Sequence, residues 1–145
     1  MLVRVQRSTV DVLESIAVGS VAVTALALAQ AGVELTFAQW RVLVVISDLA
    51  DGATVGEIAT RIGSAHSPAS RLVARMRRHG LVATEQDTHD RRATRVRMTD
   101  HGRDVRERVV GRRRALLEEA VGANPLPPTV AQRLDALAGL LRGFE

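Results

Sequence analysis

The sequence predicts a single, mainly α-helical domain that carries one small β-hairpin. Apolar residues recur at helical spacing in six segments, several of which are bounded by capping residues or glycine. Residues 81–87 and 94–99 instead alternate between apolar and polar side chains, as paired strands do. The chain has 145 residues, of which 46% are hydrophobic and 25% charged, so it can bury the core of one domain and is too apolar for a disordered tail.

The first helix is expected from about Arg7 to Ala31 and is unusually apolar. Nineteen uncharged residues separate Glu14 from Glu34, which is long enough for a membrane span. The segment is rich in alanine, glycine, serine and threonine and has acidic residues at both ends, which favours a buried helix instead. A chain this short offers little to cover such a helix, so we expect a second subunit to cover it.

Two capped helices follow. The stretch LTFAQWRVLVVISDLADG begins with a capping box of Thr36 and Gln39, and TVGEIATRIG has a second box of Thr54 and Glu57 before Gly63 ends the helix. The longer helix has a predicted buried stripe of Phe37, Trp40, Leu43, Val44 and Leu49.

The fourth helix, SAHSPASRLVARMRRHG, has one apolar and one basic face. We expect Ser67 to cap it, Pro68 to occupy its first helical position and Gly80 to end it. Its inward set is Ala69, Leu72, Val73 and Met76. Its outward set is Ser67, Ser70, Arg71, Arg75, Arg77 and Arg78. Two helices joined across GSAHS form either a helix-turn-helix or an ordinary helical hairpin with a solvated charged face.

The segment QDTHDRRATRVRM joins the two predicted strands and holds four arginines. Alternation places Arg95 and Arg97 on one face of the second strand and Val96 and Met98 on the other. The arginines of the hairpin tip cannot pack inward, because buried unpaired guanidinium groups are too costly. The tip must therefore face solvent or a polyanion.

Positive charge is concentrated in this middle part of the chain. All 20 basic residues are arginine, and residues 61–97 contain nine of them against three acidic residues, a net charge of +6. The whole chain carries only +4, so the remainder is −2. A localised anion-binding face is the interpretation, since arginine makes bidentate contacts to phosphate and guanine.

Two C-terminal helices complete the chain. Thr99 is expected to cap a long helix that ends near Gly122, and NPLPP separates it from the last helix. The apolar stripes of the two helices are Val105, Val109, Leu116 and Ala120, then Val130, Leu134, Leu137 and Leu141.

The sequence from Leu35 to Gly102 resembles the MarR-type winged helix-turn-helix transcription regulators. The resemblance rests on LTFAQWRVL, TVGEIATRIG, SPASRLVARMRRHGLV and the wing DTHDRRATRVRMTDHG, in which Met98 replaces a leucine. It implies a homodimer that binds double-stranded DNA at a palindromic operator, more often as a repressor. It also implies a small aromatic effector between the DNA-binding and dimerisation regions. No signal peptide is visible, so we expect a cytoplasmic location.

The resemblance divides the chain into three regions of one structural domain. Residues 1–34 form an N-terminal dimerisation helix, and residues 100–145 form C-terminal dimerisation helices. Residues 35–99 form the winged helix-turn-helix, with a recognition helix at about 67–79 and a wing at about 81–99. The predicted DNA-binding residues are Ser67, Ser70, Arg71, Arg75, Arg77, Arg78, Arg91, Arg92 and Arg95.

Two smaller sites follow from the same resemblance. Asp90 and Arg92 would form an ion pair that stiffens the wing, which leaves Arg91 to enter a minor groove. Phe37 and Trp40 would line the effector pocket.

Three other classes of function are a metal-binding protein, an enzyme and a protein–protein adaptor. Asp87, His89 and Asp90, or Asp100 and His101, could bind a metal, but no two histidines have tight ligand spacing, so we expect no metal and no cofactor. No phosphate-binding glycine loop or nucleophile motif is present, so we expect no enzyme. A dimeric protein–protein adaptor or ligand sensor without sequence-specific DNA binding stays as the alternative.

Overall fold

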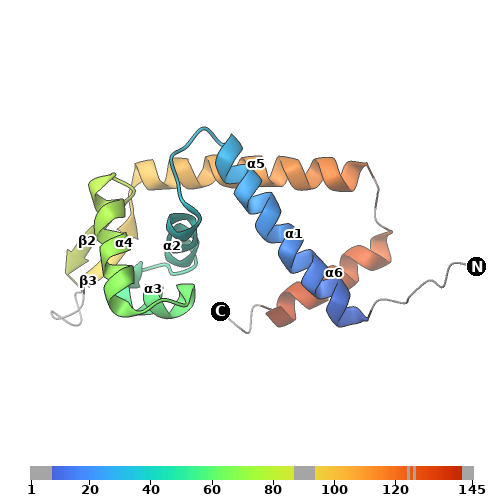
Figure 1. Cartoon of the computed structure of the whole chain (residues 1–145), viewed down its shortest axis with the longest axis horizontal. Coiled ribbons are helices and arrows are strands. Elements are labelled where there is room, and N and C mark those ends of the chain that lie inside the picture. Colours follow the sequence, from blue (N-terminus) through green and yellow to red (C-terminus); the bar gives the residue numbers. More distant parts are fainter. Residues whose placement is uncertain (1–7, 87–93, 124, 126, 142–145) are drawn as a thin grey trace, which may run out of the picture.

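The computed structural model describes residues 8–86, 94–123, 125 and 127–141 (Figure 1). Helices and strands follow in the predicted order, with one short strand added. The elements are α1 (Thr9–Gln30), α2 (Phe37–Ser47), β1 (Ala53–Thr54), α3 (Val55–Ile62), α4 (His66–Arg78), β2 (Val82–Gln86), β3 (Thr94–Met98), α5 (Asp100–Gly122) and α6 (Pro128–Leu141). The prediction of a mainly helical chain with a small hairpin is confirmed.

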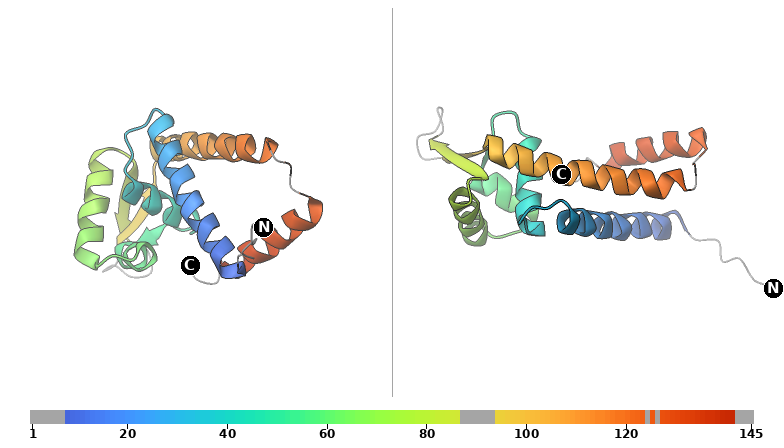
Figure 2. Two further views of the ribbon diagram at one scale, coloured as in Figure 1. Left: turned by 45° about the vertical axis from the view of Figure 1, so that its right-hand side comes forward. Right: turned by 90° about the horizontal axis from the view of Figure 1, so that it is seen from above.

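The elements form a dense block and an open frame of long helices. The block contains α2, α3, α4 and the sheet, whereas α1, α5 and α6 extend away from it (Figures 1 and 2). Helix α5 starts in the block, directly after β3, and continues into the frame, where α1 packs against it. One helix is therefore shared by both parts of the molecule.

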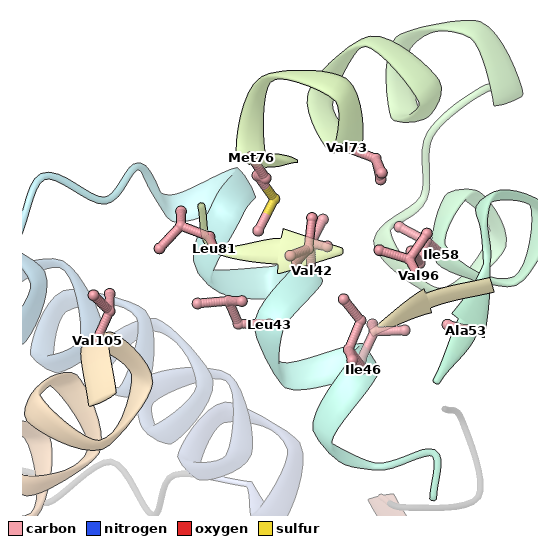
Figure 3. Packing of buried hydrophobic residues seen from close by; sticks show 12 residues of the cluster. Val42, Leu43, Ile46, Ala53, Ile58, Val73, Met76, Leu81, Val96 and Val105 are labelled. Carbon is pink, nitrogen blue, oxygen red and sulfur yellow. The ribbon is translucent and has the colours of Figure 1, made fainter. Parts of the chain in front are cut away.

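Helix α2 lies at the centre of the core. Around it pack α3, α4, the sheet and the start of α5 (Figure 3). The members of this cluster that are labelled in Figure 3 are Val42, Leu43, Ile46, Ala53, Ile58, Val73, Met76, Leu81, Val96 and Val105. Trp40 belongs to a second cluster, with Ala27 and Leu28 of α1 and Val109 of α5.

The predicted single stripe on α2 is wrong in part. Trp40 and Leu43 are buried as expected, but Val42, Val45 and Ile46 are buried too, while Phe37 is 39% exposed. The reason is that α2 is covered on more than one side, so its buried surface extends around most of the helix. Periodicity alone describes a helix that is buried on one side only.

The sheet has three antiparallel strands in the order β1-β3-β2. The central strand pairs Val96 with both Ala53 of β1 and Thr84 of β2. The sequence did not predict β1, because two residues beside a helix cap show no periodicity. Gly52 precedes β1 with a φ of +76°, and a Cβ atom there would lie 2.6 Å from the carbonyl oxygen of Val96. Glycine is therefore required where β1 meets β3.

Side-chain caps fix where most of the helices begin. The capping boxes of Thr36 with Gln39 and of Thr54 with Glu57 are both present as predicted. Thr99 caps α5 as predicted and accepts a hydrogen bond from the Gly102 amide. These local rules were reliable because a cap depends on residues only three positions apart.

The predicted start of α4 is wrong. The helix begins at His66 with Ala65 as its N-cap, and no side chain makes a capping hydrogen bond. Ser67 and Pro68 therefore lie in the first turn, each two positions further into the helix than expected for a serine cap followed by proline. Proline is tolerated there because the first amides of a helix have no intrahelical partner in any case.

Helix α1 exposes a large apolar surface. Val10, Val18 and Val21 are 65%, 70% and 55% exposed, whereas only its C-terminal half contributes buried residues. This helix is long and apolar enough to cross a membrane. Core helices of soluble proteins can have the same length and composition. Its contacts to α5 include a 2.9 Å hydrogen bond from Arg113 to the Ser20 hydroxyl, so part of α1 is docked in a protein environment.

The junction of α5 with the block depends on a glycine. A Cβ atom on Gly102 would lie 2.1 Å from the carbonyl oxygen of Leu81, which is backbone and cannot rotate away. The Gly102→Ala variant should therefore lose about 1–3 kcal/mol of stability in urea unfolding, the usual range for overpacking. The control is Gly56→Ala in α3, where the new methyl group would meet only the Thr54 hydroxyl at 3.9 Å. That variant should be neutral or gain up to about 1 kcal/mol. Equal stability of the two variants would contradict this account of the junction.

Candidate nucleic-acid interface

Helix α4 has one face in the core and one face in solvent. Ala69, Val73 and Met76 are at most 3% exposed, and Leu72 is half-buried, as predicted. The predicted outward residues are all exposed: Ser67, Ser70, Arg71, Arg75, Arg77 and Arg78. The helix lies at the outer edge of the block (Figures 1 and 2), so this basic face is a surface of the molecule.

The turn that leads into α4 is held by backbone and side-chain contacts. Gly63 ends α3 in the left-handed conformation, and the Ser64 amide donates to the Ala59 carbonyl at 2.8 Å. Arg41 of α2 donates to the Arg61 carbonyl at 2.7 Å and so ties the end of α3 to the central helix. The direction of α4 is thus set by α2 and α3 together.

The capping box at the start of α3 adds a charged contact. The Thr54 amide and hydroxyl donate to one carboxylate oxygen of Glu57 at 2.7 and 2.9 Å. These bonds, the backbone one first, lower the pKa of Glu57. The carboxylate is therefore ionised at neutral pH, at the positive end of the α3 dipole.

Most guanidinium groups of α4 have no partner among the residues that the structure describes. Arg77 donates to the Thr84 hydroxyl of β2 at 3.3 Å. Within the described part of the chain, Arg71, Arg75 and Arg78 make neither a hydrogen bond nor an ion pair. Three arginines on one exposed helix face are therefore available to a polyanion.

The arginines at the base of the wing have internal partners instead. Arg97 lies 3.2 Å from Glu85, and Arg95 donates to the Gly52 carbonyl at 3.3 Å. Val96 between them is fully buried, so the predicted alternation of the second strand is confirmed. These contacts join β3 to β2 and to the turn that precedes β1. The predicted pair of Asp90 with Arg92, and the predicted probe Arg91, lie outside the described residues.

The two residues predicted for an effector pocket lie in different surroundings. Phe37 lines a cavity of about 380 Å³ together with Pro68 and Leu72 of α4. Trp40 is 5% exposed and packs against Leu28 and other residues of α1 and α5. The structure thus does not bring the two rings together around one cavity of the described residues.

The sequence did not indicate that Arg41 lines the cavity beside α4. Arg41 lies one helical turn after Phe37 and lines the same cavity beside the start of α4. Its spacing from Phe37 could have revealed this position. The described residues contain no group of three or more potential metal ligands, and Asp87, His89 and Asp90 lie outside them.

The geometry defines a class of protein. Three helices of which the last two form a helix-turn-helix, followed directly by an antiparallel hairpin, make a winged helix-turn-helix. The long helices before and after this unit extend beyond it (Figure 2).

Comparison with known proteins agrees with this class. The MarR family model matches residues 33–93. The chain is similar to the transcriptional activatory protein BadR of Rhodopseudomonas palustris, with 40% identity over 75 residues. This alignment covers 50% of the chain and 43% of BadR, so it spans less than half of that relative.

Solved structures match over nearly the whole chain. A MarR family protein from Bacillus stearothermophilus superposes with a TM-score of 0.77 at 26% identity, covering 92% of this chain and 90% of that one. CouR from Rhodococcus jostii, solved with bound p-coumaroyl-CoA, has a TM-score of 0.65 at 26% identity, with 90% and 89% covered. The chain is thus similar to MarR family transcriptional regulators, in sequence over residues 33–93 and in fold over nearly its whole length.

Proposed function

We propose that this protein binds double-stranded DNA as a homodimer, with α4 in the major groove and the wing at the minor groove. The observation that carries the proposal is the two-faced α4. Its apolar face is fixed in the core, while Arg71, Arg75 and Arg78 extend from an exposed face without internal partners among the described residues. A rigid helix with free guanidinium groups suits both base contacts and phosphate contacts.

Positions along α4 suggest how these contacts are divided. Ser67, Ser70 and Arg71 lie in the first two turns, the part of a recognition helix that meets base edges. Arg75, Arg77 and Arg78 lie in its last turn and are placed to hold phosphates. Arg77 also contacts Thr84, so its side chain is directed towards the wing strand rather than along the groove.

Arg71→Ala should relax sequence specificity. A guanidinium that bridges a guanine contributes about 1–3 kcal/mol of discrimination against other bases. The operator is first obtained by in vitro selection from random duplexes, where a homodimer should select a palindrome. The variant is then titrated against single-base operator changes, with the exposed Arg108→Ala of α5 as the charge-matched control. Equal weakening on every duplex would make Arg71 a phosphate contact and contradict this role.

Arg91→Ala should weaken binding through lost recognition of groove shape rather than of individual bases. We assign Arg91 to a narrow minor groove, where A·T tracts concentrate negative potential. Loss of one phosphate contact per subunit should reduce the slope of log K against log salt by about one, or roughly two per dimer. The loss should be larger on operators with A·T-rich flanks than on G·C-rich ones. Unchanged affinity and salt slope would show that this arginine only solvates a loop.

The apolar surface of the frame supports dimerisation. Helix α1 exposes valines on several sides, and Leu117 and Val121 of α5 and Val130 and Leu134 of α6 are also more than one-third exposed. Large exposed apolar surface usually marks an interface. We propose that a second copy of this chain covers this surface. The dimer would then place two α4 helices on one duplex.

Dimerisation predicts a simple hydrodynamic result. Light scattering of the full chain should give twice the monomer mass of 15.6 kDa, and the mass should persist on dilution. Deletion of residues 1–30 should yield aggregated or unfolded protein, because it removes half of the cluster around Trp40. A stable monomer of the full chain would contradict the proposal.

An aromatic effector is proposed for the junction of α1, α2 and α5. The support is the similar fold of CouR, which binds p-coumaroyl-CoA, and the location of Trp40 in the cluster that joins these helices. A ligand that separates α1 from α2 would also shift α4, since α2 contacts both parts of the molecule.

Salicylate-like compounds should change the fluorescence of Trp40, the single tryptophan of the chain, and should release DNA over the same concentration range. The two readouts must coincide, because a bound ligand shifts an equilibrium only by its difference in affinity for the two states. No response across a broad aromatic panel would remove the effector from this site.

The salt dependence of duplex binding distinguishes the proposed DNA-binding protein from the alternative, a protein–protein adaptor. A DNA-binding protein loses affinity for duplexes steeply as salt rises, whereas an adaptor shows no salt-dependent binding to duplex DNA.

We propose a repressor located in the cytoplasm. BadR is named an activatory protein, so a promoter–reporter assay with the selected operator decides the direction of regulation.

A further inference from the structure

A cavity of about 510 Å³ lies at the junction of three elements: the C-terminal end of α2, the wing strands and the first turns of α5. Its volume is within the range of small-molecule sites. Aliphatic side chains form part of its wall, among them Leu49, Ala83 and Met98. Charged side chains from β3 and α5 line the rest, including Arg97, Arg103 and Arg106.

The charged groups of this cavity differ in how far they are already paired. Arg97 lies 3.2 Å from Glu85, and Arg103 is bonded to the Met98 carbonyl at 2.9 Å and to the Asp100 carboxylate. Arg106 makes no hydrogen bond or ion pair within the described part of the chain. The cavity therefore offers one uncommitted guanidinium group.

Two nitrogen atoms of the wall are shielded from solvent without an acceptor. The Nε atoms of Arg97 and Arg106 are buried and donate no hydrogen bond within the described residues. The contact of Arg97 with Glu85 is an ion pair that lacks hydrogen-bond geometry. Buried donors that belong to charged groups are costly to leave unpaired. Arg97 already has the Glu85 carboxylate beside it, so Arg106 is the group that favours an anionic oxygen from a ligand.

We propose that this cavity binds a short aliphatic carboxylate. The carboxylate would accept hydrogen bonds from Arg106 and Arg97, and the alkyl chain would lie on Leu49, Ala83 and Met98. A monoanion fits better than a phosphate, because the five charged lining residues, three arginines and two glutamates, sum to only +1. No aromatic ring lines the cavity, so an aromatic ligand would find no stacking partner there.

This site is separate from the effector site proposed above, since neither Phe37 nor Trp40 lines it. Its wall joins β2 and β3 of the wing to α5. A bound carboxylate would therefore connect the wing to the helix that continues into the frame. An effect of the ligand on DNA affinity rests on the proposed function, whereas binding itself does not.

The test is calorimetric titration of the full-length, DNA-free protein with sodium octanoate and, separately, with neutral octanamide. Octanoate should bind at least tenfold more tightly than octanamide, as expected for hydrogen bonds to a charged group. Arg106→Gln should weaken octanoate at least tenfold. Arg108→Gln removes the same charge two positions along α5 at an exposed site outside the cavity, and it should bind like the wild type within about twofold.

A second variant tests the apolar wall. Ala83→Leu adds volume within the cavity and should block octanoate, and thermal melts should show that each variant remains folded. Wild-type affinity in Arg106→Gln or in Ala83→Leu would overturn the site. Equal binding of octanamide, or no binding of octanoate to the wild type, would overturn it as well. Salicylate binding more tightly than octanoate in an Arg106-dependent manner would overturn the aliphatic assignment. Because no DNA is present, loss of the proposed DNA-binding function leaves this result unaffected.

Discussion

The structure depends on one constraint: most of the circumference of α2 is apolar, so only a narrow side of this helix can face solvent. Val42, Val45 and Ile46 are buried on the side of the helix-turn-helix and sheet, while Trp40 is buried against α1 and α5. A helix that is apolar around most of its circumference must be covered on several sides. The winged unit supplies one cover, and the long helices supply the other. Neither part can therefore be removed without exposing apolar surface of α2.

The same constraint connects the basic face of α4 to the long helices. Val73 and Met76 anchor α4 in the cluster around α2, and Arg41 ties α2 to the end of α3. Interiors are close-packed, so a rotation of α2 against α1 or α5 must be followed by a shift of α4 or by a cavity in the core. The proposed effector would need such a link between distant sites. A single helix, α2, provides this link.

Sequence reasoning succeeded where a structural feature depends on near neighbours in the chain. The caps at Thr36, Thr54 and Thr99 and the inward residues of α4 were predicted because capping and helical spacing act over three or four positions. It failed where tertiary contacts decide. Phe37 is exposed because its neighbours on α3 and α4 leave a cavity beside it, and β1 exists only because β3 pairs with it. The assignment of bases and phosphates to the arginines of α4 stays a prediction, since no nucleic acid contact is present to test it.

The use of arginine alone for positive charge has a further structural consequence. At the wing base, Arg95 donates to a backbone carbonyl and Arg97 forms an ion pair with Glu85, whereas Arg71 and Arg75 of α4 have no such partner among the described residues. A planar guanidinium with five donors can bond a protein acceptor with one edge and present another edge to a ligand. The wing arginines are therefore positioned before any partner arrives. The arginines of α4 instead lose side-chain entropy when they bind, at a cost of up to about 2 kcal/mol each. On the proposed function, a duplex with well-placed phosphates and guanines offsets that cost and a poorly matched one does not, so exposed arginines on a fixed helix would favour discrimination between sequences over non-specific affinity.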